Sequence, residues 1–231
     1  MASNAVTKNR LLPGGNAWEV AGSLDILSGG EFRLAGVPIT ATAQQINALS
    51  GLINADGDIE IANTVWEDLR FPATGINPPG AASDPVRDTS DGRLVFSASA
   101  TNIIAVQVQM PHAWLPGSSL HPHVHWSPAT ANSGNVLFQI SYKIANVNEA
   151  FPADFTTAVV IGAAGGAADK HQLSSFPSIP MTGKTLSCML LMLIARIGGD
   201  DQDTYASTIK LNEFDIHYEI DTLGSAEELT K

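Results

Sequence analysis

The sequence predicts an all-β fold: a jelly-roll-like antiparallel β-sandwich preceded by an extended N-terminal arm that carries one short helix. From Trp66 onward, apolar residues recur with a period of two in about eight short runs, separated by turn signals such as Asp91-Gly92 and Gly198-Gly199. No helical period lies between these runs, which is typical of a sandwich or a barrel. We therefore divide the chain into an arm, residues 1–65, and a sandwich domain, residues 66–231.

The arm is rich in glycine and contains two strand-like pieces, residues 23–27 and 31–37. Thr42 and Gln45 have the spacing of a capping box, and Gly51 lies where a glycine would end a helix of two to three turns. Such a segment cannot bury a core of its own. We expect it to pack on a neighbouring subunit, with Ile46 and Leu49 as contacts.

The predicted strands of the sandwich are short. The clearest alternation places Ile104, Val106 and Val108 on one face. The longest apolar run, residues 186–195, is about half of what a membrane helix needs, so we interpret it as a buried strand. The strands are expected at residues 94–98, 103–110, 120–126, 136–144, 157–161, 186–197, 207–211 and 213–220.

Composition excludes several classes of partner and fold. The 231 residues include 12 Lys and Arg against 23 Asp and Glu, a net charge of −11 with a pI near 4.8. An acidic surface repels phosphate, so neither a nucleic acid nor a membrane surface is an expected partner. One cysteine, Cys188, allows no intrachain disulfide, and its apolar setting indicates burial. No signal peptide is apparent, so we expect a soluble protein made in a cytoplasm.

Four of the six histidines fall within 14 residues. In a strand, His121, His123 and His125 would share one face, and facing imidazoles are natural ligands for transition metals. These three are the candidate metal ligands, of a structural metal if any, and no other cofactor is expected. The alternatives are a histidine row hydrogen-bonded to backbone and water, or, in a trimer, a row that faces the threefold axis and binds metal there.

The same histidines, preceded by Gly117, resemble the metal motif of cupins. The carboxylate that should follow a few residues later is missing after His125, so a cupin-like metalloenzyme is a remote alternative. No nucleophile elbow, phosphate loop or zinc-protease motif occurs, and we expect no enzymatic activity. Asp200, Asp201 and Asp203 could hold calcium but are more simply a solvated hairpin tip, and Glu213, Asp215 and Glu219 are most simply a solvent face.

The four tryptophans are spread along the chain. We interpret Trp18, Trp66, Trp114 and Trp126 as core or interface anchors. An alternative role is as a platform for sugar rings, for which Trp114 is the residue to test.

Residues 24–40 and especially 40–51, Thr-Ala-Thr-Ala-Gln-Gln-Ile-Asn-Ala-Leu-Ser-Gly, resemble N-terminal segments of tailed-bacteriophage virion proteins. The second segment is similar to the T-A-x-E-L-N-x-L-x-G element of phage fibre, spike and decoration proteins, with Gln44-Gln45-Ile46 in place of the commoner Ala-Glu-Leu. Segments 110–112, 117–118, 122–126 and 221–225 resemble phage structural proteins as well.

The resemblance implies a virion structural protein, typically trimeric, with an arm and a β-rich body. We expect a capsid decoration, or cement, protein that stabilises the head. Its partners would be the major capsid protein or other virion proteins and further copies of itself. The alternative within the virion is a head-fibre, neck or tail adhesin component that binds host glycans.

Overall fold

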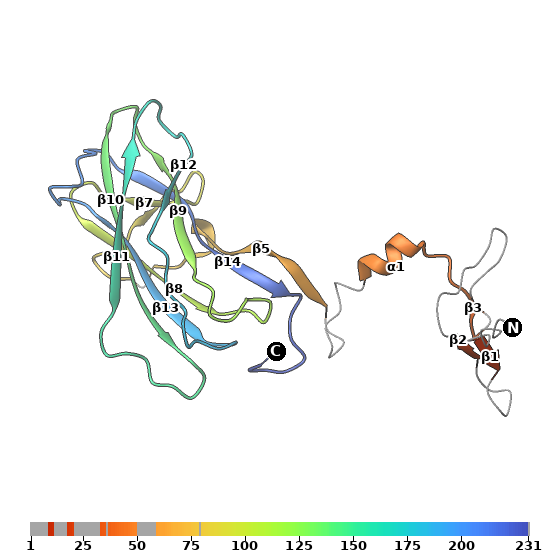
Figure 1. Cartoon of the computed structure of the whole chain (residues 1–231). Coiled ribbons are helices and arrows are strands. Elements are labelled where there is room, and N and C mark those ends of the chain that lie inside the picture. The colour runs from red at the N-terminus through yellow and green to blue at the C-terminus, as the bar shows by residue number, and fades with distance from the viewer. Residues whose placement is uncertain are drawn as a thin grey trace, which may run out of the picture. The chain divides into compact units, whose positions relative to one another are not determined.

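The computed structural model describes residues 9–11, 18–20, 33–35, 37–49, 59–78 and 80–230 (Figure 1). The chain divides into two compact units, residues 1–50 and 51–231. Strand β5 (Glu60–Pro72) pairs with the last strand of the body, β14 (Ile209–Thr222), so residues 60–65, which the sequence analysis assigned to the arm, belong to a strand of the body. In the described residues, no helix has the length and apolarity needed to cross a bilayer.

The described residues of the N-terminal unit form two pairs of antiparallel strands and one helix. Strand β1 (Asn9–Leu11) pairs with β2 (Trp18–Val20), and β3 (Arg33–Leu34) pairs with β4 (Val37–Pro38). The described residues of the expected strand at 31–37 therefore belong to two paired strands, and Ala35 between them has a φ of 48°. The expected strand at 23–27 lies outside the described residues.

Helix α1 (Ala43–Leu49) begins as the capping box predicts. The Gln45 backbone N–H donates to Thr42 Oγ1 over 3.2 Å, and the Thr42 N–H donates to Gln45 Oε1 over 2.8 Å. Two backbone donors that a helix N-terminus leaves free are thereby satisfied. The Ile46 side chain is exposed, whereas the side chain of Leu49 lies outside the described part of the chain.

The body consists of two antiparallel sheets that face each other (Figure 1). One sheet has the order β11-β10-β13-β8, from β8 (Thr101–Gln109), β10 (Gly134–Ala145), β11 (Thr156–Ala164) and β13 (Met189–Ile197). The other has the order β12-β9-β14-β7-β6, from β6 (Val86–Arg87), β7 (Leu94–Phe96), β9 (His121–Pro128), β12 (Gln172–Ser175) and β14. Strand β5 lies beside β14, and a short 3-10 helix, η1 (Ala73–Gly75), follows it.

This strand order confirms the jelly roll. We count the eight main strands from β7, the first, to β14, the last. The sheet that contains β14 then has the order first, eighth, third, sixth, and the sheet that contains β8 has the order second, seventh, fourth, fifth. Consecutive strands thus alternate between the sheets or pair within one, as two interlocked Greek keys require. The last strand, β14, is central in its sheet, with β9 on one side and β7 and β5 on the other.

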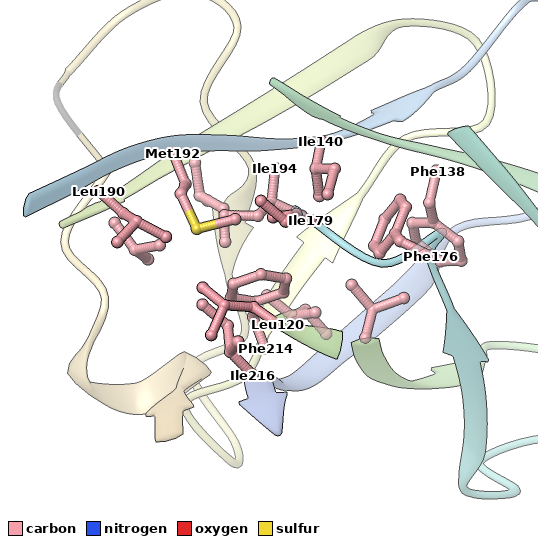
Figure 2. Packing of buried hydrophobic residues seen from close by; sticks show 14 of the residues in the cluster. Leu120, Phe138, Ile140, Phe176, Ile179, Leu190, Met192, Ile194, Phe214 and Ile216 are labelled. Carbon is pink, nitrogen blue, oxygen red and sulfur yellow. The ribbon is translucent and has the colours of Figure 1, made fainter. Parts of the chain in front are cut away.

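The core lies between the sheets (Figure 2). Phe214 and Ile216 of β14 face Ile140, Met192 and Ile194 of the other sheet, and each of these side chains is almost fully buried. Because side chains alternate along a strand, the residues between them must point away from the core. That outer face of β14, β9 and β5 carries the polar groups described next.

Candidate functional site

A β-bulge sets which residues of β14 point outward. The register against β9 shifts between Leu211 and Glu213, so that Leu211 and Phe214 both face the core although they are three positions apart. An extra residue reverses the alternation that follows it. Glu213, Asp215 and His217 are thereby placed on the outer face.

Three strands then bring their polar residues together in rows. His123 of β9 lies opposite Asp215, which lies opposite Arg70 of β5. In the adjacent row, His121 lies opposite His217, which lies opposite Asp68. His121, His123 and His125 share one face of β9. Their neighbours on that face come from β5, about 50 residues earlier in the sequence, and from β14, about 90 residues later.

The centre of this face is a triad of His123 and Asp215, which are buried, and His217, which is partly exposed. One potential ligand atom from each residue lies within 4.8 Å of the other two. Nε2 of His123 is 3.3 Å from Oδ1 of Asp215, and the side chains of both residues are only 7% exposed. The rings of His123 and His217 meet edge to face with centroids 4.2 Å apart.

Burial sets the charge state of the triad. Desolvation, with the neighbouring His217 and His125, lowers the pKa of His123 to about 4, so this imidazole is neutral at pH 7. Desolvation raises the pKa of Asp215, an effect opposed by His125. At neutral pH the His123–Asp215 contact is therefore not an ion pair.

Further groups surround the triad. His125 Nε2 lies 3.2 Å from Asp215 Oδ2, and His125 Nδ1 lies 2.8 Å from Nε2 of His171, whose ring stacks on it. Asp68 Oδ1 lies 2.6 Å from Nε2 of His217. His121 meets the edge of the Trp66 ring at a centroid distance of 5.0 Å and does not belong to the triad.

A pocket of about 470 Å³ opens beside the triad. It contains three carboxylates, from Asp68, Glu213 and Asp215, against the single guanidinium of Arg70, which forms a bidentate pair with Glu213 at 2.6 and 2.8 Å. The excess of two formal negative charges favours a cation. The pocket is lined by Asp68, Arg70, His125, His171, Asn212, Glu213 and Asp215.

Several sequence-based expectations require correction. Trp114 and Trp126 are completely buried in the chain's own core, which agrees with their interpretation as core anchors and leaves neither exposed as a sugar platform. Trp66 is 48% exposed, and the Trp18 side chain lies outside the described residues. Asp215, interpreted as part of a solvent face, is buried, and it supplies from β14 the carboxylate that is missing after His125.

The sequence carries a signal for the polar face of β14. Glu213, Asp215 and His217 alternate with apolar residues in the same period-two pattern as the histidine row. A second strand with a histidine in its polar face is the natural partner of such a row. His171 and Asp68 have no comparable local pattern.

Comparison with known proteins identifies no family. No family model matches the chain, and no curated protein matches it. Similar solved structures include the CBM36-1 domain of a multidomain xylanase from the hindgut metagenome of Trinervitermes trinervoides, with 9% identity over 65% of this chain and 96% of that domain and a TM-score of 0.34.

Two other similar structures are larger. A Paenibacillus cycloisomaltooligosaccharide glucanotransferase matches with 9% identity over 63% of this chain and 17% of its own, at a TM-score of 0.39. A structure of infectious bursal disease virus, Gx strain, matches with 11% identity over 88% of this chain and 40% of its own, at a TM-score of 0.33. The chain thus spans well under two thirds of either protein. Likeness at this level carries no functional argument.

Proposed function

We propose that this chain is a structural protein of a tailed-phage virion, most specifically a trimeric capsid decoration protein that stabilises the head by binding across capsid subunits. The proposal involves no chemical reaction. Its mechanism is the burial of surface between copies of the chain and the capsid, which raises the barrier to rupture of the particle.

One observation carries the proposal. The segment that resembles the virion element, residues 40–51, contains a helix with a complete capping box, in a unit distinct from the jelly-roll body. Ile46 on that helix is 46% exposed. A short helix of this kind gains most of its stability from packing, so a partner for its apolar residues is expected.

The body offers a second surface for assembly. Strand β11 is an edge strand, and Val159 and Ile161 point outward from it with about half of each side chain exposed. Phe151 and Phe155, in the loop that leads into this strand, are also exposed. Exposed apolar groups on an unpaired edge are typical of protein interfaces, and we assign these to contacts between copies. Jelly rolls include many viral capsid domains, which supports the proposal by analogy of fold alone.

The test uses particles of the encoding phage that lack this protein. Purified full-length chain should be trimeric by light scattering, should co-sediment with these particles, and should reduce their release of DNA on heating. Ile46→Ser should weaken co-sedimentation at least about tenfold, because it removes an exposed apolar contact. Val86→Ser, which changes an exposed apolar residue of the body, is the matched control and should bind as the parent does.

Two results would contradict the decoration role: particles without the chain that withstand heat as well as complete ones, or binding that is indifferent to Ile46→Ser. Immuno-electron microscopy of complete particles separates head from neck, fibre and tail. Labelling at the tail would exclude the decoration role while leaving a virion role.

A specific observation favours the alternative of a glycan-binding adhesin. Trp66 is exposed beside His121, on the same sheet face as the carboxylates and Arg70 of the pocket. An exposed indole near polar groups suits the apolar face and hydroxyls of a sugar. Trp66→Ala should abolish binding on a glycan array, with Val86→Ala as control. An array without bound glycan for the parent chain rejects this alternative.

A further inference from the structure

We infer that His123, Asp215 and His217 bind one divalent transition-metal ion of the zinc class on the outer face of the sheet formed by β9, β14 and β5. The inference goes beyond the proposed structural role and does not depend on it.

The donors already lie close to a coordination geometry. Zinc bonds to histidine nitrogen and carboxylate oxygen are about 2.0–2.2 Å long, so tetrahedral ligands lie about 3.3 Å apart. His123 Nε2 and Asp215 Oδ1 are separated by 3.3 Å, and all three residues offer an atom within 4.8 Å of the others. Coordination of one ion requires side-chain rotation that brings the atoms now up to 4.8 Å apart to this separation.

Two buried polar atoms of the triad lack a hydrogen-bond partner, and one of them, Asp215 Oδ1, faces His123 Nε2. His123 Nδ1 and Asp215 Oδ1 are inaccessible to solvent, and neither has a hydrogen-bond partner among the described residues. A buried polar atom without a partner is destabilising, so such atoms are rare unless something satisfies them. Coordination of a cation by Asp215 Oδ1 removes one of these costs and brings the His123 ring to the same ion.

The surrounding residues hold the ligands in place. Asp68 binds one nitrogen of His217 at 2.6 Å, the carboxylate–histidine contact that orients metal-ligating imidazoles. The second carboxylate oxygen of Asp215 is held by His125, which in turn contacts His171. A row of solvated histidines that binds no ion would not require the contacts made by Asp68, His125 and His171 to be fixed in this way.

The donor set selects the ion. Two imidazoles and one carboxylate suit Zn²⁺, Co²⁺, Ni²⁺ or Fe²⁺, whereas Ca²⁺ and Mg²⁺ prefer ligand sets made of oxygen alone. Three protein ligands leave at least one coordination position, and the acidic pocket beside Asp215 gives water or an oxygen ligand access to it.

The experiment uses the full-length chain after dialysis against a chelator. Calorimetric titration with Zn²⁺ should show one ion per chain. Co²⁺ should give the visible absorption bands of a nitrogen- and oxygen-ligated site, and Zn²⁺ should displace them. Asp215→Asn and His217→Gln should each weaken Zn²⁺ binding by about 100-fold or more, and Asp68→Asn by about 10- to 100-fold.

His112→Ala is the matched control, because His112 contacts Ser187 and Ser225 and lies outside the triad. It should bind Zn²⁺ as the parent does. Circular dichroism confirms that each variant is folded, and His217→Gln changes a side chain that is 42% exposed, so it should fold. Parent chain that binds no Zn²⁺, binding unchanged in both Asp215→Asn and His217→Gln, or a stronger response to Ca²⁺ than to Zn²⁺ would each overturn the inference.

Discussion

Arg196 and Asp203 form a bidentate ion pair in which neither side chain is exposed to solvent, with Nη2–Oδ1 and Nε–Oδ2 distances of 2.7 and 2.9 Å. The remaining donors of Arg196 reach the carbonyl oxygens of Tyr205 and Ser207, and Asp203 also accepts from the Leu137 N–H. The expectation that Asp203 belongs to a solvated or calcium-binding hairpin tip was therefore wrong. Asp203 thus links the β13–β14 loop to β10 through Leu137 and to β13 through Arg196. Asp200 and Asp201, in the same loop, are exposed.

Removal of one partner of this pair should strongly destabilise the body. Arg196→Met or Asp203→Ala leaves an uncompensated buried charge, and we expect a loss of about 3–5 kcal/mol in the free energy of unfolding, measured by urea denaturation. The double variant Arg196→Met/Asp203→Ala should lose less than the sum of the single changes. Single changes no larger than that of Arg70→Gln, at an exposed pair, would contradict this prediction.

Gly198 cannot accept a side chain. A Cβ atom at this position would lie 2.6 Å from the carbonyl oxygens of both Ala100 and Ser97, and backbone does not move aside easily. We expect Gly198→Ala to lower the midpoint of thermal unfolding, with a cost of about 1–3 kcal/mol. Gly75→Ala is the control, since its Cβ would meet nothing within 4 Å. Equal stability of the two variants would refute the argument.

Cys188 should be unreactive while the body is folded. Burial raises the pKa of its thiol to about 11, and the thiolate is the form that reacts. Ellman's reagent at mildly alkaline pH should modify native protein slowly and urea-unfolded protein at once. Rapid stoichiometric labelling of native protein would show that the end of β13 opens readily.

Asp88 should titrate at unusually low pH. Hydrogen bonds from Lys210 and Ser90 lower its pKa from 3.8 to about 2. Because the folded value is depressed, its contribution to stability is complete above about pH 4 and is lost as the pH falls through about 2. Carboxyl chemical shifts followed by NMR should show this midpoint, and Lys210→Met should move it upward. A midpoint near 4 in the parent chain would contradict the contact with Lys210.

The strands with clean alternation, such as β8 and β10, were predictable from sequence, and so was the capping box of α1. Strand β5 was missed because its outward residues, Trp66, Asp68 and Arg70, mix a large apolar ring with charges. The shared face of the three histidines followed from period two alone. Their partners Asp215 and His217 did not, because the register between β9 and β14 depends on a bulge that no local pattern indicates.

The central position of β14 has a consequence for synthesis on the ribosome. Until residues 209–222 emerge, β5 and β9 each lack the strand that hydrogen-bonds to one of their edges, and the sheet is incomplete. A nascent chain halted before that point exposes two unpaired strand edges. Such edges bind chaperones and promote aggregation. Products that stall or are truncated before residue 209 should therefore accumulate in inclusion bodies.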